Sequence, residues 1–187
     1  MCGRYQFIDD QSELLKKLAE ELRQKLPEDK YDQISLYEVF PSQYACVGVY
    51  DSKAASFGIA VMHWGFPVNG KMLINARSES IEEKITFRNC SPCVILASGY
   101  YEWSRQPRRK YHFTCSDKPL YLAGLCRTEQ GQQQFVILTE DAGEPEIHIH
   151  DRQPVILSAA EARRWCKEKD IRRMPTSSRN NRIMTAV

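Results

Sequence analysis

The stretch CVILASGYYEW, residues 93–103, joins an apolar run to a run of aromatic residues. Short apolar runs bounded by Gly, Pro, Asp or Ser are typical of β-strands, so the stretch predicts strand structure. In an extended chain, Tyr100 and Glu102 share one face, and Tyr101 and Trp103 share the other. A carboxylate placed among aromatic side chains is either paired or has a raised pKa. The alternative for Glu102 is the solvent-facing end of a strand.

Further strands are predicted through the middle of the chain, most of them bounded by turn-forming residues. The runs are YACVGVY (44–50), FGIAVMHW (57–64), KYHFTC (110–115), LYLAGLC (120–126), QFVILT (134–139) and QPVIL (153–157). Helical patterns occur only on either side of this region, and β and α segments do not alternate regularly. The sequence therefore predicts an α+β domain built around an antiparallel or mixed sheet.

Two amphipathic helices are predicted. In residues 9–26, leucines at helical spacing form one stripe, and Asp10 precedes Glu13 by three residues, which predicts a capping box. The leucines are Leu14, Leu15, Leu18, Leu22 and Leu26. In residues 158–169, Ser158 and Glu161 repeat the cap, and Ala162 and Trp165 are expected to face inward.

One domain is expected over residues 1–187, because this length suffices to bury a core without disulfides. The segment PTSSRNNRIMTAV, residues 175–187, is polar and basic and lacks periodicity. We expect it to be mobile or to lie along a partner.

Charge, hydropathy and cysteine content limit the partners and the cellular location that can be expected. A net charge of +2 is too small to indicate a nucleic-acid partner by itself, so such a partner would need a local basic patch. The chain shows neither a secretory signal nor a membrane-spanning run, so we expect it in the cytoplasm, or in the nucleus of a eukaryote. Seven cysteines without secretory context predict reduced thiols.

The chain begins MCGRY, which places a cysteine at position 2. If Met1 is removed, Cys2 carries both a thiol and a free α-amine, and the two groups together form a 1,2-aminothiol. An α-amine titrates at roughly 7.7–8.0 and a thiol near 8.5, so modest perturbation activates either group at neutral pH. The alternative is an inert thiol near a frayed terminus.

Two polar segments are further candidates. In LINARSES, residues 73–80, Asn75 and Arg77 share a face if the segment is extended, so an orienting amide would lie beside a cation suited to phosphate. The alternative is a polar turn. In IHIHDRQPVIL, residues 147–157, His148 and His150 alternate into a predicted strand, with Arg152 two residues further on.

The sequence does not predict a metal site or any cofactor. His148 and His150 have metal-ligand spacing, but no third ligand is evident nearby. The CSPC segment, residues 90–93, lacks the second cysteine pair of a zinc site and the βαβ context of a redox site.

Together these segments resemble the SOS response-associated peptidase (SRAP) family, from residue 2 to about residue 160, in the form of a bacterial-type minimal domain. The motifs are MCGRY, HWGF, NARSES, CVILASGYYEW, AGL, ILT and IHDRQPVIL, in that order. Their joint occurrence is far more specific than any one of them alone. Gln153 departs from the family pattern, which has methionine there, and the segment after Trp64 lacks the usual second tryptophan.

The resemblance implies a bifurcated mixed or antiparallel sheet with a barrel-like core and flanking helices. It also implies a monomer that binds single-stranded DNA, forms a covalent thiazolidine with the ring-opened sugar of an abasic site and acts at the nucleoid during DNA damage. Peptidase activity toward Met1 and a lyase activity are further expectations. The family's catalytic residues fall on Cys2, Asn75, Glu102 and His150, and its DNA-binding residues on Arg4, Trp64, Arg77 and Arg152.

The chemistry gives these residue types distinct roles. An aldehyde and a 1,2-aminothiol combine into a stable five-membered ring, with the amine attacking first and the tethered thiol closing the ring. His150 would assist opening of the sugar, Glu102 would move protons and Asn75 would fix the terminus. Two rival hypotheses remain: a cysteine peptidase that uses Cys2 and His150, and a non-catalytic DNA-binding module.

Overall fold

The computed structural model describes residues 2–115, 119–168, 170–171, 175, 177 and 182–187. The helices are α1 (Glu13–Lys25), α2 (Glu28–Tyr31) and α3 (Ala159–Glu168), with short 3-10 helices at Ser78–Ser80, Ile85–Phe87 and Glu146–His148. The strands are β1 (Tyr5–Gln6), β2 (Glu38–Val39), β3 (Tyr44–Asp51), β4 (Ser56–Trp64), β5 (Phe66–Val68), β6 (Lys71–Leu73), β7 (Asn75–Arg77), β8 (Ser91–Ala97), β9 (Gly99–Trp103), β10 (Lys110–Cys115), β11 (Leu120–Glu129), β12 (Gln132–Asp141), β13 (Arg152–Pro154), β14 (Ile156–Leu157) and β15 (Arg182–Ala186).

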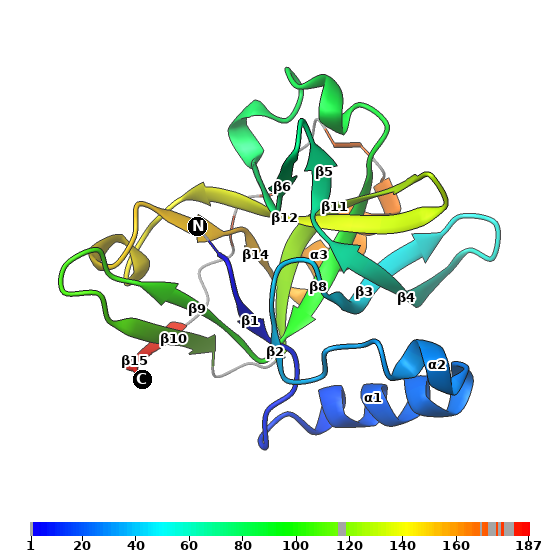
Figure 1. Cartoon of the computed structure of the whole chain (residues 1–187), viewed down its shortest axis with the longest axis horizontal. Helices are drawn as coiled ribbons and strands as arrows, with labels where there is room; N and C mark the ends of the chain where they lie inside the picture. Colours follow the sequence, from blue (N-terminus) through cyan, green and yellow to red (C-terminus); the bar gives the residue numbers. More distant parts are fainter. Residues whose placement is uncertain (1, 116–118, 169, 172–174, 176, 178–181) are drawn as a thin grey trace.

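The larger sheet closes on itself. Strands β3, β4, β8, β11 and β12 form a ring, because β12 pairs with both β11 and β4. Strand β12 runs parallel to β4 and to β7, and the other pairs of the ring are antiparallel. The expected α+β fold with a mixed sheet and a barrel-like core is confirmed (Figure 1).

The segment 93–103 connects this ring to a second sheet. Strand β8 lies in the ring, whereas β9 belongs to a sheet in the order β15-β10-β9-β1-β2. At the bend, the backbone N–H of Ser98 donates to the carbonyl of Gln6 at 2.8 Å, and the Ser98 hydroxyl donates to the same oxygen at 3.3 Å. The bend therefore holds the amino-terminal strand β1 against β9 (Figure 1).

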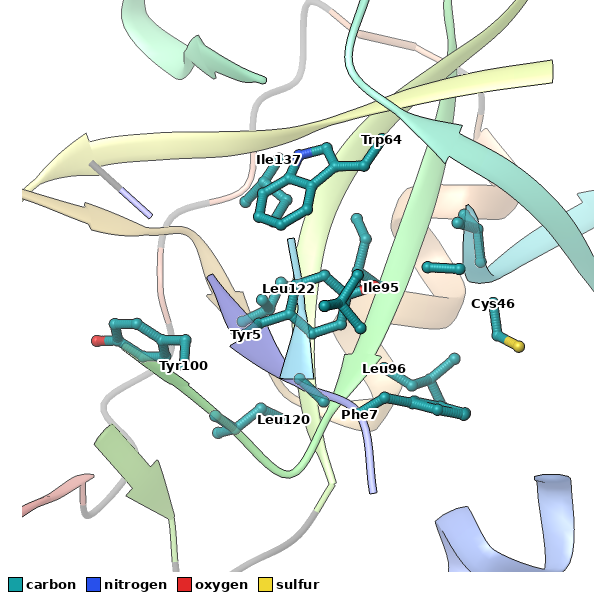
Figure 2. Packing of buried hydrophobic residues seen from close by; sticks show 14 of the residues in the cluster. Tyr5, Phe7, Cys46, Trp64, Ile95, Leu96, Tyr100, Leu120, Leu122 and Ile137 are labelled. Atoms are coloured by element: carbon teal, nitrogen blue, oxygen red, sulfur yellow. The ribbon is translucent and has the colours of Figure 1, made fainter. Parts of the chain in front are cut away.

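Aromatic side chains fill the interior of the ring. Trp64 is completely buried and stacks on Phe135, with 6.0 Å between ring centroids and 12° between planes. Tyr5 packs against Trp64 at 5.3 Å, so the amino-terminal strand contributes directly to this core (Figure 2). Close packing also explains Gly124, because a Cβ atom there would lie 2.8 Å from the carbonyl of Val136.

Both predicted helices form, but the buried face and the N-cap of α1 differ from the prediction. Leu15, Ala19 and Leu22 are buried in α1, whereas Leu14 is 55% exposed. The predicted Asp10–Glu13 capping box is wrong, because Ser12 occupies the N-cap position and its N–H donates to Asp9 Oδ1 at 2.8 Å. Asp9 thereby organises the turn before the helix.

The cap of α3 is confirmed. The Ser158 N–H donates to the Glu161 carboxylate at 2.8 Å, and the Glu161 N–H donates to the Ser158 hydroxyl at 3.3 Å. Ala162 and Trp165 are buried, as predicted, and the Trp165 indole N–H donates to carbonyls of β8 and β11 at 3.2 Å.

The carboxy-terminal segment was expected to be mobile or to lie along a partner. Instead, its residues 182–186 form β15, which pairs antiparallel with β10 from Tyr111 to Cys115. Residues 176 and 178–181 of that segment lie outside the described residues. Within the described ranges, none of the helices is long and apolar enough to span a membrane.

Candidate functional site

Cys2 lies where β1 approaches β9. Its side chain is completely buried, and its Sγ atom lies 3.7 Å from the carbonyl oxygen of Arg4. The Tyr101 N–H donates to the same carbonyl at 2.9 Å, and Tyr5 faces Tyr100 across the strand pair. Cys2 is thus part of the interior, which argues against an inert thiol in a frayed segment.

Asn75 fixes the backbone of Cys2. Asn75 begins β7, which runs beside β12 with Asn75 opposite Ile137. Its side-chain nitrogen donates to the carbonyl oxygen of Cys2 at 2.9 Å, within a buried environment. Its Oδ1 atom is also buried and makes no hydrogen bond to any of the described residues. The amide therefore orients Cys2 and retains an acceptor for a further donor.

Glu102 is buried close to the thiol. Burial raises the pKa of Glu102 above its usual value, as the position of this residue in the sequence suggested. Burial also raises the pKa of the Cys2 thiol, and the negative charge of Glu102 raises it further. The alternative of a solvent-facing Glu102 is wrong, since only 3% of the residue is exposed. The site therefore favours a neutral thiol near a carboxyl group that holds its proton more strongly than usual.

His150 lies in the loop before β13, so the prediction that the histidines alternate along a strand is wrong. Its Nδ1 atom lies 3.0 Å from the backbone nitrogen of Arg152 and 2.7 Å from Asp151 Oδ1. Burial lowers the pKa of His150, although Asp151 opposes this effect. A half-buried imidazole that is neutral at pH 7 is suited to general acid–base chemistry.

His148 takes no part in this arrangement. It lies in the short helix Glu146–His148, and its Nε2 atom pairs with Glu144 at 2.8 Å on the surface. No group of histidine, cysteine and carboxylate side chains among the described residues could hold a metal ion.

Arg4 and Arg77 differ in whether their guanidinium groups are paired within the protein. The guanidinium of Arg4 lies 4.1 Å from the ring centroid of Phe40 and 5.1 Å from that of Trp103, and it pairs with Glu38 at 3.2 Å. Arg77 is exposed, and its side chain makes no hydrogen bond or ion pair with the part of the chain that the structure describes. Arg77 is thus available to a phosphate group.

Arg152 and Trp64, the other two residues expected to bind DNA, are buried. Only 6% of the Arg152 side chain is exposed, and its guanidinium pairs with Glu79 at 2.7 Å and with Asp141. It also donates to the backbone carbonyl of Thr139 at 2.7 Å. Trp64 is completely buried, and its indole N–H donates to the carbonyl of Ile74 at 3.0 Å. Both side chains are held by contacts within the protein.

One group of residues near the site was not predicted. Glu146 is completely buried, accepts a hydrogen bond from the Tyr100 hydroxyl and pairs with Arg182 at 2.7 Å. The only sequence signal was the alternation that placed Tyr100 on the same face as Glu102. The partners Glu146 and Arg182 are 46 and 82 residues from Tyr100, a separation at which no local pattern links them.

A family model described as SOS response associated peptidase (SRAP) matches residues 1–184. The chain belongs to the SRAP family. Curated SRAP relatives include the Escherichia coli abasic site processing protein YedK, which is 27% identical over 90% of this chain and 81% of its own length. The Bacillus subtilis abasic site processing protein YoqW is 30% identical over 91% of this chain and 82% of its own length.

Solved structures agree on the SRAP fold. A crystal structure of a protein from Bordetella bronchiseptica superposes with a TM-score of 0.73, at 23% identity, and covers all of this chain and 99% of that chain. At that identity the likeness concerns the fold. The family membership and the fold that the sequence resemblance implied are therefore confirmed.

Proposed function

We propose that this protein binds single-stranded DNA and joins itself to an abasic site through Cys2 after Met1 has been removed. The observation that carries the proposal is the 2.9 Å hydrogen bond from Asn75 to the carbonyl of Cys2, which fixes the second residue next to the buried Glu102. Such contacts would be superfluous for an inert terminal thiol. The names of the curated SRAP relatives, abasic site processing proteins, point to the same lesion.

The reaction balances without a cofactor. The α-amine of Cys2 adds to the C1′ aldehyde of the ring-opened sugar and loses one water molecule to give an imine. The Cys2 sulfur then bonds to the imine carbon while the thiol proton passes to the nitrogen, which closes a thiazolidine ring. Because both nucleophiles belong to one residue, the second step proceeds at a high effective concentration.

The surrounding residues would handle the protons. Glu102, with its raised pKa, can give a proton to the departing hydroxyl and accept one from the thiol. A neutral His150 can accept the proton of the sugar C1′ hydroxyl as the furanose opens. Asn75 would hold the Cys2 backbone so that its amine faces the aldehyde.

Binding of the DNA backbone would rest on exposed cations. Arg77 is unpaired within the described residues, and Arg4 is partly neutralised by Glu38. Phosphate contacts of this kind supply affinity that weakens with salt and carries no sequence preference. Trp103, which packs against Arg4, is partly exposed and offers an aromatic surface at the end of β9.

The SRAP family description also names a peptidase. Glu102 lies near Cys2, the residue that follows Met1 in the sequence, so self-cleavage is a second route to the free amine that the proposal requires. The products separate this activity from crosslinking. Peptide hydrolysis releases free enzyme, whereas reaction with an aldehyde leaves the protein attached to DNA. Strand cleavage by a lyase step would appear as a shortened oligonucleotide.

The proposal is tested by incubating the protein with a single-stranded oligonucleotide that carries one abasic site and separating the products on a denaturing gel. We expect a heat-stable band of protein bound to DNA from the wild type and none from Cys2→Ala. Asn75→Ala should slow the reaction while undamaged DNA still binds. A heat-stable adduct from Cys2→Ala would refute the ring assignment.

A further inference from the structure

The carboxy-terminal strand reaches the candidate site through a buried ion pair. The Nε atom of Arg182, the first residue of β15, lies 2.7 Å from Glu146 Oε1, and the two side chains are 9% and 0% exposed. The Tyr100 hydroxyl donates to the same carboxylate oxygen. Glu146 thus receives a cation from β15 and a neutral donor from β9.

The burial of Glu146 makes Arg182 indispensable to this arrangement. A carboxylate removed from water needs a partner charge and hydrogen bonds, and removing one partner leaves an uncompensated buried charge. Tyr100 cannot replace the cation, because burial and the neighbouring Glu146 raise its pKa well above the ordinary value and keep it neutral.

The same guanidinium braces the loop that carries His150. Its Nη2 atom donates to the Glu144 carbonyl at 2.8 Å and to Gln153 Oε1 at 3.4 Å, so it contacts one residue before His150 and one after it, in β13. The same Oε1 atom of Gln153 also accepts the Gly143 N–H at 2.9 Å. The His150 side of the site is therefore tied to β15.

Glu146 connects the loop of His150 to strand β9. Its backbone carbonyl accepts the N–H groups of Ile149 at 2.8 Å and His150 at 2.9 Å, so the position of Glu146 sets the backbone of His150. On the other side, Tyr100 lies two residues before Glu102 in β9 and opposite Tyr5 of β1. One buried carboxylate joins β9, which carries Glu102, and β1, which follows Cys2 in the chain, to the loop that carries His150.

We infer that Arg182, acting through Glu146, is a positioning residue that aligns His150 with Cys2 and Glu102. It touches none of the reacting atoms, and its effect is transmitted by the loop. This inference rests on the proposed crosslinking reaction. It predicts that the alignment of the site depends on the carboxy-terminal strand, which follows the family motifs in the sequence.

The kinetic test uses single-turnover crosslinking at saturating abasic DNA, with separate measurement of affinity for undamaged DNA. Arg182→Met should slow crosslinking about tenfold or more, because small displacements of a catalytic group are costly. Its DNA affinity should stay within about twofold of wild type. Arg182→Lys, which keeps the charge but loses the planar fork, should give an intermediate rate.

Two further variants make the test decisive. Adding Glu146→Gln to Arg182→Met removes the buried charge and should restore part of the rate, although the contacts of Arg182 with the loop stay lost. A direct contact of Arg182 with DNA would allow no such recovery. Arg164→Met makes the same charge change at an exposed position of α3 and should leave the rate unchanged. A wild-type rate in a folded Arg182→Met protein, or a loss confined to DNA affinity, would overturn the inference.

A second readout does not depend on crosslinking. The chain has four histidines, so the imidazole signals can be resolved by NMR, and His150→Gln identifies the signal of His150. Arg182→Met should move the His150 signal in the protein without DNA, and Arg164→Met should not. If the wild type forms no crosslink while the His150 signal moves, the proposed function fails and the structural coupling stands. An unmoved signal would refute the coupling itself.

Discussion

Replacement of Trp64 separates a core role from a DNA-binding role. The structure places its indole inside the ring, stacked on Phe135 and packed against Tyr5. Trp64→Phe keeps an aromatic ring but loses the 3.0 Å hydrogen bond to the Ile74 carbonyl and part of the buried surface. The N–H of Ile137 also donates to that carbonyl at 3.1 Å, so the oxygen stays satisfied.

The expected cost follows from these contacts. A lost hydrogen bond contributes about 1 kcal/mol. The lost buried surface contributes about another 1 kcal/mol. A total of about 2 kcal/mol corresponds to a fall of about 4–8 °C in the melting temperature of a domain of this size. Trp64→Ala removes the whole side chain and should cost about 3–5 kcal/mol, a large part of the stability of a typical domain.

The assay is urea unfolding followed by fluorescence of the two remaining tryptophans, together with binding of undamaged single-stranded DNA at a temperature where each variant is folded. The core role predicts lower unfolding free energies and a DNA affinity within about twofold of wild type. The reasoning would be refuted if Trp64→Phe weakened DNA binding about tenfold with unchanged stability, because Trp64 would then contact DNA directly.

Three further predictions follow from the same structure. Arg77→Met should remove one phosphate contact and so reduce the slope of log affinity against log salt concentration by about 0.7. Arg152→Met should leave that slope unchanged and cost about 2 kcal/mol of stability through its lost buried hydrogen bonds. Equal effects of the two variants on the slope would contradict the assignment. Glu102→Gln should raise the free energy of unfolding at pH 7–8, because burial raises the folded pKa of Glu102. The contribution of such a carboxyl group to stability is fully present below its unfolded pKa and is lost as the pH rises through its folded pKa. The gain in unfolding free energy should vanish near pH 4, and a gain that persisted there would mean that burial of Glu102 is not its cause. Ser158→Ala should cost about 1 kcal/mol by removing the α3 cap, measured by urea unfolding, and a neutral result would show that the cap does not stabilise the native state.

The sequence predicted most of the strands because their signals are local. Runs such as 44–50 and 120–126 reappear within β3 and β11, and the Ser158–Glu161 cap reappears in α3. Helix α1 shows the limit of such patterns. Spacing alone could not tell that Leu14 would face solvent, because the packing partners of the helix come from distant segments.

The site residues that belong to sequence motifs were predictable, whereas contacts between distant segments were not. The neighbourhood of Cys2, Asn75 and Glu102 follows from the family motifs, and the structure brings these residues together. The resemblance assigns Arg152 and Trp64 to DNA binding, but the sequence does not reveal the carboxylates that surround Arg152 or the rings that enclose Trp64. The pairing of Glu146 with Arg182 depends on the long-range placement of β15, for which the polar segment 175–187 gave no periodic signal.

The central claim is that Cys2, freed of Met1, forms a ring with the aldehyde of an abasic site. Intact mass spectrometry before and after incubation with an abasic single-stranded oligonucleotide tests it most directly. The account predicts a starting mass that lacks methionine and a product mass equal to protein plus oligonucleotide minus one water. A protein that lacks methionine but gains no mass would contradict the claim and would favour hydrolysis as the chemistry of Cys2.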